Sequence, residues 1–345
     1  TLLSPVTLTV RATVDDAKTT LGEGGAVSFE NGDQVRILCL DSQGAVKSVT
    51  ASVSVSQGTA TISATLEDSD NYYAVYPASL TAILAQDGTL TVTDPVSQGG
   101  TFSSASLCAA KTGKAELTFN FKHIVSLLKF EVDRTDIASV DIIAKGGVNL
   151  AGNLVCAFSG DAVTVTGGSE PSINVTLGGA GTYYAAVSPT AEASALALRM
   201  NKTGEIIPAV NVAPKSAIKF ERATVKNLGR IDDRVVTDYY ISTDGIGTGL
   251  STDSYAPVSL MRSLITGAEL YYNWIVAGTT FRLKTGTTYV LQSAFNVKPT
   301  VPSPFTIVGI GGKAVFSGNK KCQLFNMENA DVTLQSLTLQ DALSV

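Results

Sequence analysis

Alternation of apolar and polar residues is the feature that most limits what this chain can fold into. In the stretch VTLTVRATV, the even-numbered positions from Val6 to Ala12 are apolar and the odd-numbered positions from Thr7 to Thr13 are polar. A period of two residues places successive side chains on opposite faces of a β-strand, so this segment is expected to be a half-buried strand. Similar stretches recur along the chain, separated by turns rich in Gly, Asn and Asp.

The composition agrees with an all-β protein. Only 16% of the residues are charged, and Thr, Ser, Val, Ala and Gly are abundant where long helices would need Glu, Lys, Leu and Arg. With 345 residues, the chain has room for two or three domains, each with its own core. No apolar run approaches the roughly 18 residues that a membrane-spanning helix needs.

Charge and the scarcity of metal ligands exclude several classes of function. The net charge is −5 and Lys and Arg do not cluster, so no nucleic-acid partner is expected. The cysteines form no C-x-x-C pair. Most are expected to act as small buried hydrophobes, and a disulfide between two of them is the alternative that the sequence leaves open. His123 is the one histidine, which rules out a multi-histidine metal site and favours a structural role for this residue. We therefore expect no metal, no cofactor and no catalytic residue.

Two similar ten-residue segments, NYYAVYPASL and GTYYAAVSPT, occur in the chain, and we call each of them a copy of the repeated phrase. Each is aromatic and apolar, and each ends at a proline, which cannot donate to a sheet ladder. We interpret each phrase as a core strand of its own β-sandwich, with Tyr73 and Tyr184 on the buried face and Tyr72 and Tyr183 on the opposite face. Two related sandwiches in tandem are therefore predicted.

The alternation changes phase between the two predicted sandwiches. Apolar positions are odd-numbered from Leu117 to Phe121 and even-numbered from Leu128 to Val132. A strand cannot change phase without a bulge, a turn or a change of sheet, so a break is predicted at Ile124–Leu127, with a domain boundary close by. A short helix over these residues is the alternative.

A different pattern follows Ile231. Short strands recur about every 20–30 residues, a spacing typical of solenoid coils. Pro257 suits the start of a short helix. Its apolar face would consist of Val258, Met261, Leu264 and Ile265. This part resembles the start of a pectate-lyase-like right-handed parallel β-helix with a short capping helix, and we expect it to continue beyond the last residue of the sequence.

Several motifs together resemble the fimbrillin family: FENGDQVRI, YYAVYPA, FKHIVSLLKFEV, NLAGN, TYYAAVSPT and IKFERATVKNLGRI. Members of that family are pilus subunits made of two transthyretin-like β-sandwiches. The resemblance covers roughly residues 5–231 and implies an all-β fold with two tandem transthyretin-like β-sandwiches. The expected domains are a first sandwich at 1–122, a second at 123–232, a linker at 233–237 and the β-helix start at 238–345.

The resemblance implies how the chain would assemble. Fimbrillins join by strand addition, in which a protease cuts after an arginine near the start and a partner's strand replaces the first strand. Arg11 is the candidate processing site, although an ordinary outward-facing strand arginine explains it equally well. The implied partners are other pilus subunits. The implied location is the bacterial cell surface and outer membrane, with a lipid anchor before assembly on a segment preceding Thr1.

The function expected from this resemblance is that of a tip or accessory adhesin and not of an enzyme. It would bind a glycan or a host-surface protein through the β-helix. Tyr271, Tyr272 and Trp274 could stack a sugar, although aromatic packing in the core is the favoured interpretation. The alternative function is a surface enzyme acting on polysaccharides, with the sandwiches as a spacer. Such an enzyme needs clustered carboxylates with a basic partner, and the acidic residues of this part are scattered in the sequence.

Overall fold

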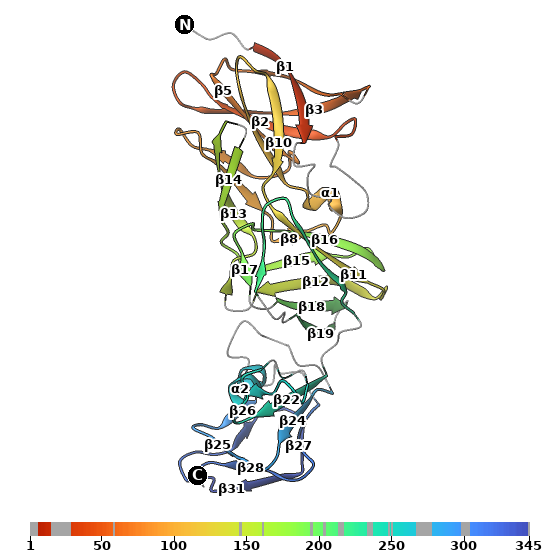
Figure 1. The fold of residues 1–345 in the computed structure, drawn as a ribbon, viewed down its shortest axis with the longest axis vertical. Helices are drawn as coiled ribbons and strands as arrows, with labels where there is room; N and C mark the ends of the chain where they lie inside the picture. The colour runs from red at the N-terminus through yellow and green to blue at the C-terminus, as the bar shows by residue number, and fades with distance from the viewer. Residues whose placement is uncertain are drawn as a thin grey trace. The chain divides into compact units, whose positions relative to one another are not determined.

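A computed structural model shows an all-β protein (Figure 1). It describes residues 6–14, 29–57, 59–144, 147–160, 162–193, 196–202, 205–212, 217–232, 237–247, 249, 251–266, 278–297 and 304–343. The chain divides into two compact units: Thr1–Leu196 with Pro214–Arg230 (unit 1), and Ala197–Ala213 with Ile231–Val345 (unit 2). Within the described ranges, neither helix has the length and apolar character needed to cross a membrane.

Seven strands of unit 1 pair into a closed barrel, in the order β1-β10-β9-β5-β2-β3-β4. Their bounds are β1 Val6–Val14, β2 Gln34–Leu40, β3 Val46–Ser56, β4 Thr59–Leu66, β5 Asn71–Tyr76, β9 Cys108–Gly113 and β10 Thr118–His123. Strand β3 pairs with β2 and then with β4, and β10 pairs with β1 and then with β9. Because of these shared strands, the seven strands close into one barrel. The sequence had predicted a sandwich of two sheets here.

The other elements of unit 1 form smaller sheets. They are β6 Ala82–Leu84, β7 Leu90–Asp94, β8 Ser97–Gln98, α1 Phe102–Ala105, β11 Ser126–Val132, β12 Ile137–Ala144, β13 Gly152–Ser159, β14 Ala162–Gly167, β15 Ser172–Thr176, β16 Gly181–Val187, β17 Glu192–Ala193, β20 Ile218–Lys219 and β21 Val225–Arg230. The sheets have the orders β14-β13-β7-β6 and β16-β11-β21, β12 pairs with β15, β15 with β8, and β17 with β20. Strands β18 Leu196–Lys202 and β19 Glu205–Val212 follow β17 in the sequence.

Strand pairing crosses the boundary predicted at residues 122 and 123. Strand β7 pairs with β13 from Asp94↔Gly152 onward, and β8 pairs with β15. The predicted break in the alternation is confirmed, since β10 ends at His123 and β11 begins at Ser126. The alternative of a helix at this place is wrong.

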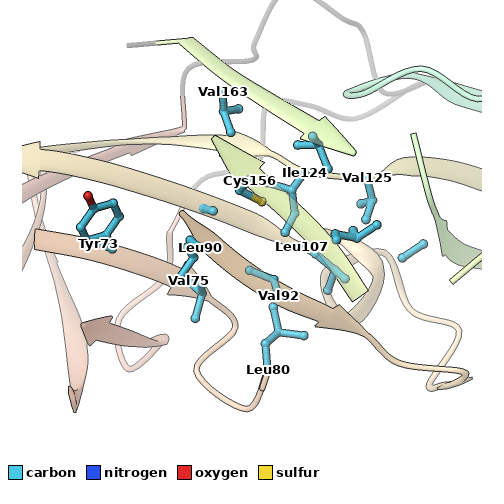
Figure 2. Packing of buried hydrophobic residues seen from close by; sticks show 14 of the residues in the cluster. Tyr73, Val75, Leu80, Leu90, Val92, Leu107, Ile124, Val125, Cys156 and Val163 are labelled. Carbon is cyan, nitrogen blue, oxygen red and sulfur yellow. The ribbon is translucent and has the colours of Figure 1, made fainter. Parts of the chain in front are cut away.

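Two of the clusters of buried residues in unit 1 lie on opposite faces of β5. The first fills the barrel and includes Tyr72 and Ala74 of β5. The second lies on the other face of the same strand, where Tyr73 and Val75 pack with residues of β6, β7, β13 and β14 (Figure 2). Strand β5 therefore has buried residues on both faces, and the pattern of alternation does not distinguish them.

The first tyrosine of each repeated phrase has a shared role that the sequence did not predict. The Tyr72 hydroxyl donates to the Glu67 carbonyl at 3.2 Å and accepts from the Ser69 amide. The Tyr183 hydroxyl donates to the Gly179 carbonyl at 2.6 Å and accepts from a neighbouring amide. Each hydroxyl therefore anchors the turn before its own strand. The predicted assignment is wrong for the second phrase, in which Tyr183 is buried and Tyr184 is half-buried.

A buried carboxyl group lies at the end of β7. Asp94 is 0% exposed, and its Oδ1 accepts a hydrogen bond from Gln98 Nε2 at 3.3 Å. Within the described part of the chain, Asp94 Oδ2 has no hydrogen-bond partner. Burial disfavours the charged carboxylate and raises the pKa of Asp94 well above its ordinary value.

We expect Asp94→Asn to remove part of the pH dependence of stability. Asp94 keeps its proton in the folded state at pH values where the unfolded chain, with an aspartate pKa of about 4, has lost it. Its contribution to stability is therefore full below about pH 4 and is lost as the pH rises through the raised pKa, by about 1.4 kcal/mol per pH unit. In urea unfolding, the free energy of unfolding of the variant should rise relative to that of the wild type between pH 5 and pH 8. Parallel pH profiles would contradict this role of Asp94.

After Ile231, the described residues of unit 2 form three parallel sheets, in the orders β23-β22-β24-β27-β30, β25-β28-β31 and β26-β29. The elements of unit 2 that follow Ile231 are β22 Asp238–Ser242, β23 Ala256–Pro257, α2 Val258–Thr266, β24 Thr280–Lys284, β25 Thr288–Val290, β26 Phe295–Val297, β27 Phe305–Ile310, β28 Ala314–Ser317, β29 Phe325–Met327, β30 Val332–Gln335 and β31 Leu337–Gln340. Because each sheet pairs strands from successive turns of the chain, aromatic side chains such as Phe295 and Phe325 stack at 5.6 Å. The predicted helix is present, with Met261, Leu264 and Ile265 buried and Val258 half-buried.

Candidate functional site

Strand β1, labelled with its neighbour β10 in Figure 1, links β10 to β4 in the barrel of unit 1. It pairs antiparallel with β4 from Val6↔Leu66 to Ala12↔Ala60. It pairs parallel with β10 from Arg11↔Thr118 onward. In the ring order, β4 and β10 are neighbours of β1 and not of each other, so departure of β1 would free one edge of each strand.

The register of β1 matches its alternation. Its even-numbered positions lie opposite residues of β4 and β10 that are buried, namely Ala60, Ile62, Ala64, Leu66, Phe119 and Phe121. The odd-numbered positions of the antiparallel pairing lie opposite Thr61, Ser63 and Thr65, which are exposed or half-buried. We call the two edges and these six buried residues the β1 slot. A strand that occupies the slot forms backbone hydrogen bonds with both edges, and its apolar face covers the six buried residues.

The structure places some of the candidate residues. The backbone of Arg11 lies in β1, where its position pairs with Thr61 and Thr118. Tyr271, Tyr272 and Trp274 lie outside the described residues. The residues of β4 and β10 that form the slot were not identified as a site from the sequence. Their alternation, in TATISATL and TFNFKH, shows which of them are buried but not which strands they neighbour.

His123 is in a buried structural setting. Its Nδ1 lies 3.5 Å from Cys108 Sγ, and its backbone carbonyl accepts a hydrogen bond from Arg222 at 3.0 Å. The four cysteines are free. Burial raises the pKa of Cys39 to about 11 and that of Cys156 to about 12, so both remain thiols at neutral pH. In the described ranges, His, Cys, Asp and Glu do not gather in a group of three or more that could hold a metal ion.

Among its described residues, unit 2 carries two partly exposed pairs of opposite charge. Asp238 Oδ1 lies 2.6 Å from Arg282 Nε, and Asp244 Oδ2 lies 3.5 Å from Lys284 Nζ. A hydrogen bond from the Ser242 hydroxyl, then one from a backbone amide, and then the charge of the Lys284 ammonium hold the pKa of Asp244 below its ordinary value. A general acid needs a raised pKa, so Asp244 is poorly suited to that role in polysaccharide cleavage.

Comparison with known proteins gives likenesses among solved structures. No protein-family model and no curated protein matches the chain. A "putative cell adhesion protein" from Bacteroides uniformis is 18% identical, with 66% of this chain and 94% of that chain covered and a TM-score of 0.38. A protein of the same description from Bacteroides ovatus is 11% identical, with 66% and 93% covered and a TM-score of 0.37. The tip fimbrial protein Mfa3 from Porphyromonas gingivalis, with C-terminal truncation, is 12% identical, with 62% and 84% covered and a TM-score of 0.26. At such low identities and TM-scores, likeness does not establish a function for this chain.

Proposed function

We propose that this chain is a cell-surface fimbrial subunit that accepts a strand from a neighbouring subunit in place of β1. The observation that carries this proposal is the β1 slot. An incoming strand with the same alternation would receive backbone hydrogen bonds from both β4 and β10 and would cover the same buried residues. The fimbrillin-like motifs of the sequence support the same mode of assembly.

The proposed position is the tip of the pilus, or another accessory position, with unit 2 as the adhesive part. Strand β21 is paired with β11 within unit 1, and the next strand, β22, already belongs to unit 2. A donor strand therefore does not follow β21 directly. The stacked parallel sheets of unit 2 support a right-handed parallel β-helix that presents a surface to a glycan or a host protein. Outer-membrane export with a lipid anchor before assembly completes this proposal.

Immunogold labelling of assembled fibres with an antibody against unit 2 tests this function. We expect label at one end of each fibre, because a subunit that accepts a strand without donating one ends the chain of connections. Fibres from a strain that lacks the gene provide the matched control. Label spaced along the shaft would contradict the tip position, and fibres without label would contradict the role as a pilus subunit.

A further inference from the structure

Two adjoining polar hollows lie where the turns of unit 1 that precede β5, β7 and β10 meet. The smaller has a volume of about 190 Å³, and its lining includes Asn71, Tyr73, Gln86, Asp87 and Lys111. The larger, of about 550 Å³, shares Asn71 and Lys111 with it. From these hollows we propose a binding site for a short neutral saccharide. The site is separate from the β1 slot and does not depend on pilus assembly.

Tyr73 provides the first observation for this site. Its side chain is 4% exposed, yet within the described part of the chain its hydroxyl has no hydrogen-bond partner. In Figure 2 the hydroxyl points away from the other labelled side chains of the cluster. Gly88 leaves room for it, since a Cβ there would lie 2.5 Å from the hydroxyl oxygen. The neighbouring Tyr72 hydroxyl, by contrast, bonds within the protein. A buried ring with an unpaired hydroxyl at the edge of a hollow is suited to bind a polar ligand.

Lys111 provides the second observation. Its Nζ lies 5.7 Å from the centroid of the Tyr73 ring, and the described residues offer it no ion-pair partner. The nearby Lys114, by contrast, is paired with Asp68 at 2.5 Å. The side-chain amides of Asn71 and Gln86 likewise have no partner among the described residues. Donors and acceptors that bond to nothing else therefore gather on one small volume.

The chemistry of these groups favours a saccharide. Ammonium, phenol and amide groups donate, whereas amide oxygens and the carboxylate of Asp87 accept. A ligand with adjacent hydroxyl groups can satisfy both kinds. Lys114 is paired with Asp68, so Lys111 is left with the three carboxylates of Asp70, Asp87 and Glu116. This excess of negative charge disfavours an acidic ligand. The smaller hollow lies below the ~300 Å³ of typical ligand pockets and suits one sugar ring, with the next ring in the larger hollow.

Glycan-array binding by the full-length protein, with neutral and acidic oligosaccharides, tests this site, followed by calorimetric titration of the best neutral sugar. We expect binding to a neutral sugar that Tyr73→Phe and Lys111→Met each weaken by about tenfold, the equivalent of one good hydrogen bond. Tyr183→Phe is the matched control, because it also removes a tyrosine hydroxyl that bonds only within the protein, at a residue that lines neither hollow, and it should leave the affinity unchanged.

Three outcomes would overturn the proposal: no binding to any neutral sugar, a preference for sialylated or sulfated glycans, or equal affinity in the wild type and both site variants. A loss of affinity in Tyr183→Phe as large as in Tyr73→Phe would also overturn it, since the effect would then come from the fold.

Discussion

Removal of residues 1–14 should lower the free energy of unfolding by about 5 kcal/mol and should create a binding site for the missing strand. Without β1, the edges of β4 and β10 lose their partner, and Ile62, Phe119 and Phe121 lose cover. Burial of a large apolar side chain is worth about 1.5–3 kcal/mol, so exposure of three such side chains accounts for a loss of this size. Thermal unfolding followed by circular dichroism would measure it against the full-length protein.

A nine-residue peptide with the sequence VTLTVRATV should restore stability to the truncated protein. Ligands that bind the folded state raise the midpoint of unfolding with concentration, so the peptide should do so in a saturable manner. The control peptide VVTTLRTAV has the same composition without the alternation, and it should have no effect because it cannot present a continuous apolar face. A truncated protein as stable as the full-length chain, or equal effects of the two peptides, would contradict the proposed role of β1.

Processing at Arg11 can be tested on the same folded protein. A trypsin-like protease should produce a new N-terminus at Ala12 if β1 leaves the barrel readily enough to enter the protease. In the structure, Arg11 lies in a strand that is paired with β4 and β10, so this strand is a poor protease substrate until it detaches. Cleavage at other loops with Thr7–Val14 intact would show that Arg11 is an ordinary strand residue.

Local pattern in the sequence predicts individual elements of this fold well. Helix α2 illustrates this, since Pro257 and the spacing from Met261 to Ile265 lie within one short segment. The break after His123 was likewise visible in the alternation on each side of it. The strand that contains Arg11 was predicted for the same reason, because its alternation is complete within nine residues.

Pairing between distant strands could not be predicted from that pattern. Alternation shows which face of a strand is buried, but it does not identify the strand that pairs with it. The pairing of β7 with β13 across the predicted boundary was therefore missed. The β1 slot was missed for the same reason, because its two edges lie about fifty residues apart in the sequence. The proposed saccharide site was missed because turns far apart in the sequence line it.

Tyr72→Ala and Tyr183→Ala should each lower the free energy of unfolding by about 3–5 kcal/mol, as large-to-small changes of buried aromatic residues do. Tyr72 is 0% exposed and Tyr183 is 9% exposed. Tyr184→Ala should cost less, because Tyr184 is half-buried and packs edge-on against Phe102 at 5.3 Å. Urea unfolding of the three variants and the wild type would measure these differences.

The hydroxyl groups separate the anchoring of the turns from the packing of the rings. Tyr72→Phe and Tyr183→Phe keep the rings but remove the bonds to the Glu67 and Gly179 carbonyls, and each should cost about 1 kcal/mol. Loss of the bond should also speed amide hydrogen exchange in the turn that each hydroxyl holds. If both phenylalanine variants behave as the wild type, the repeated phrase only fills the core. If they lose stability together with faster exchange, the phrase recurs because each strand is joined to the turn before it by its first tyrosine.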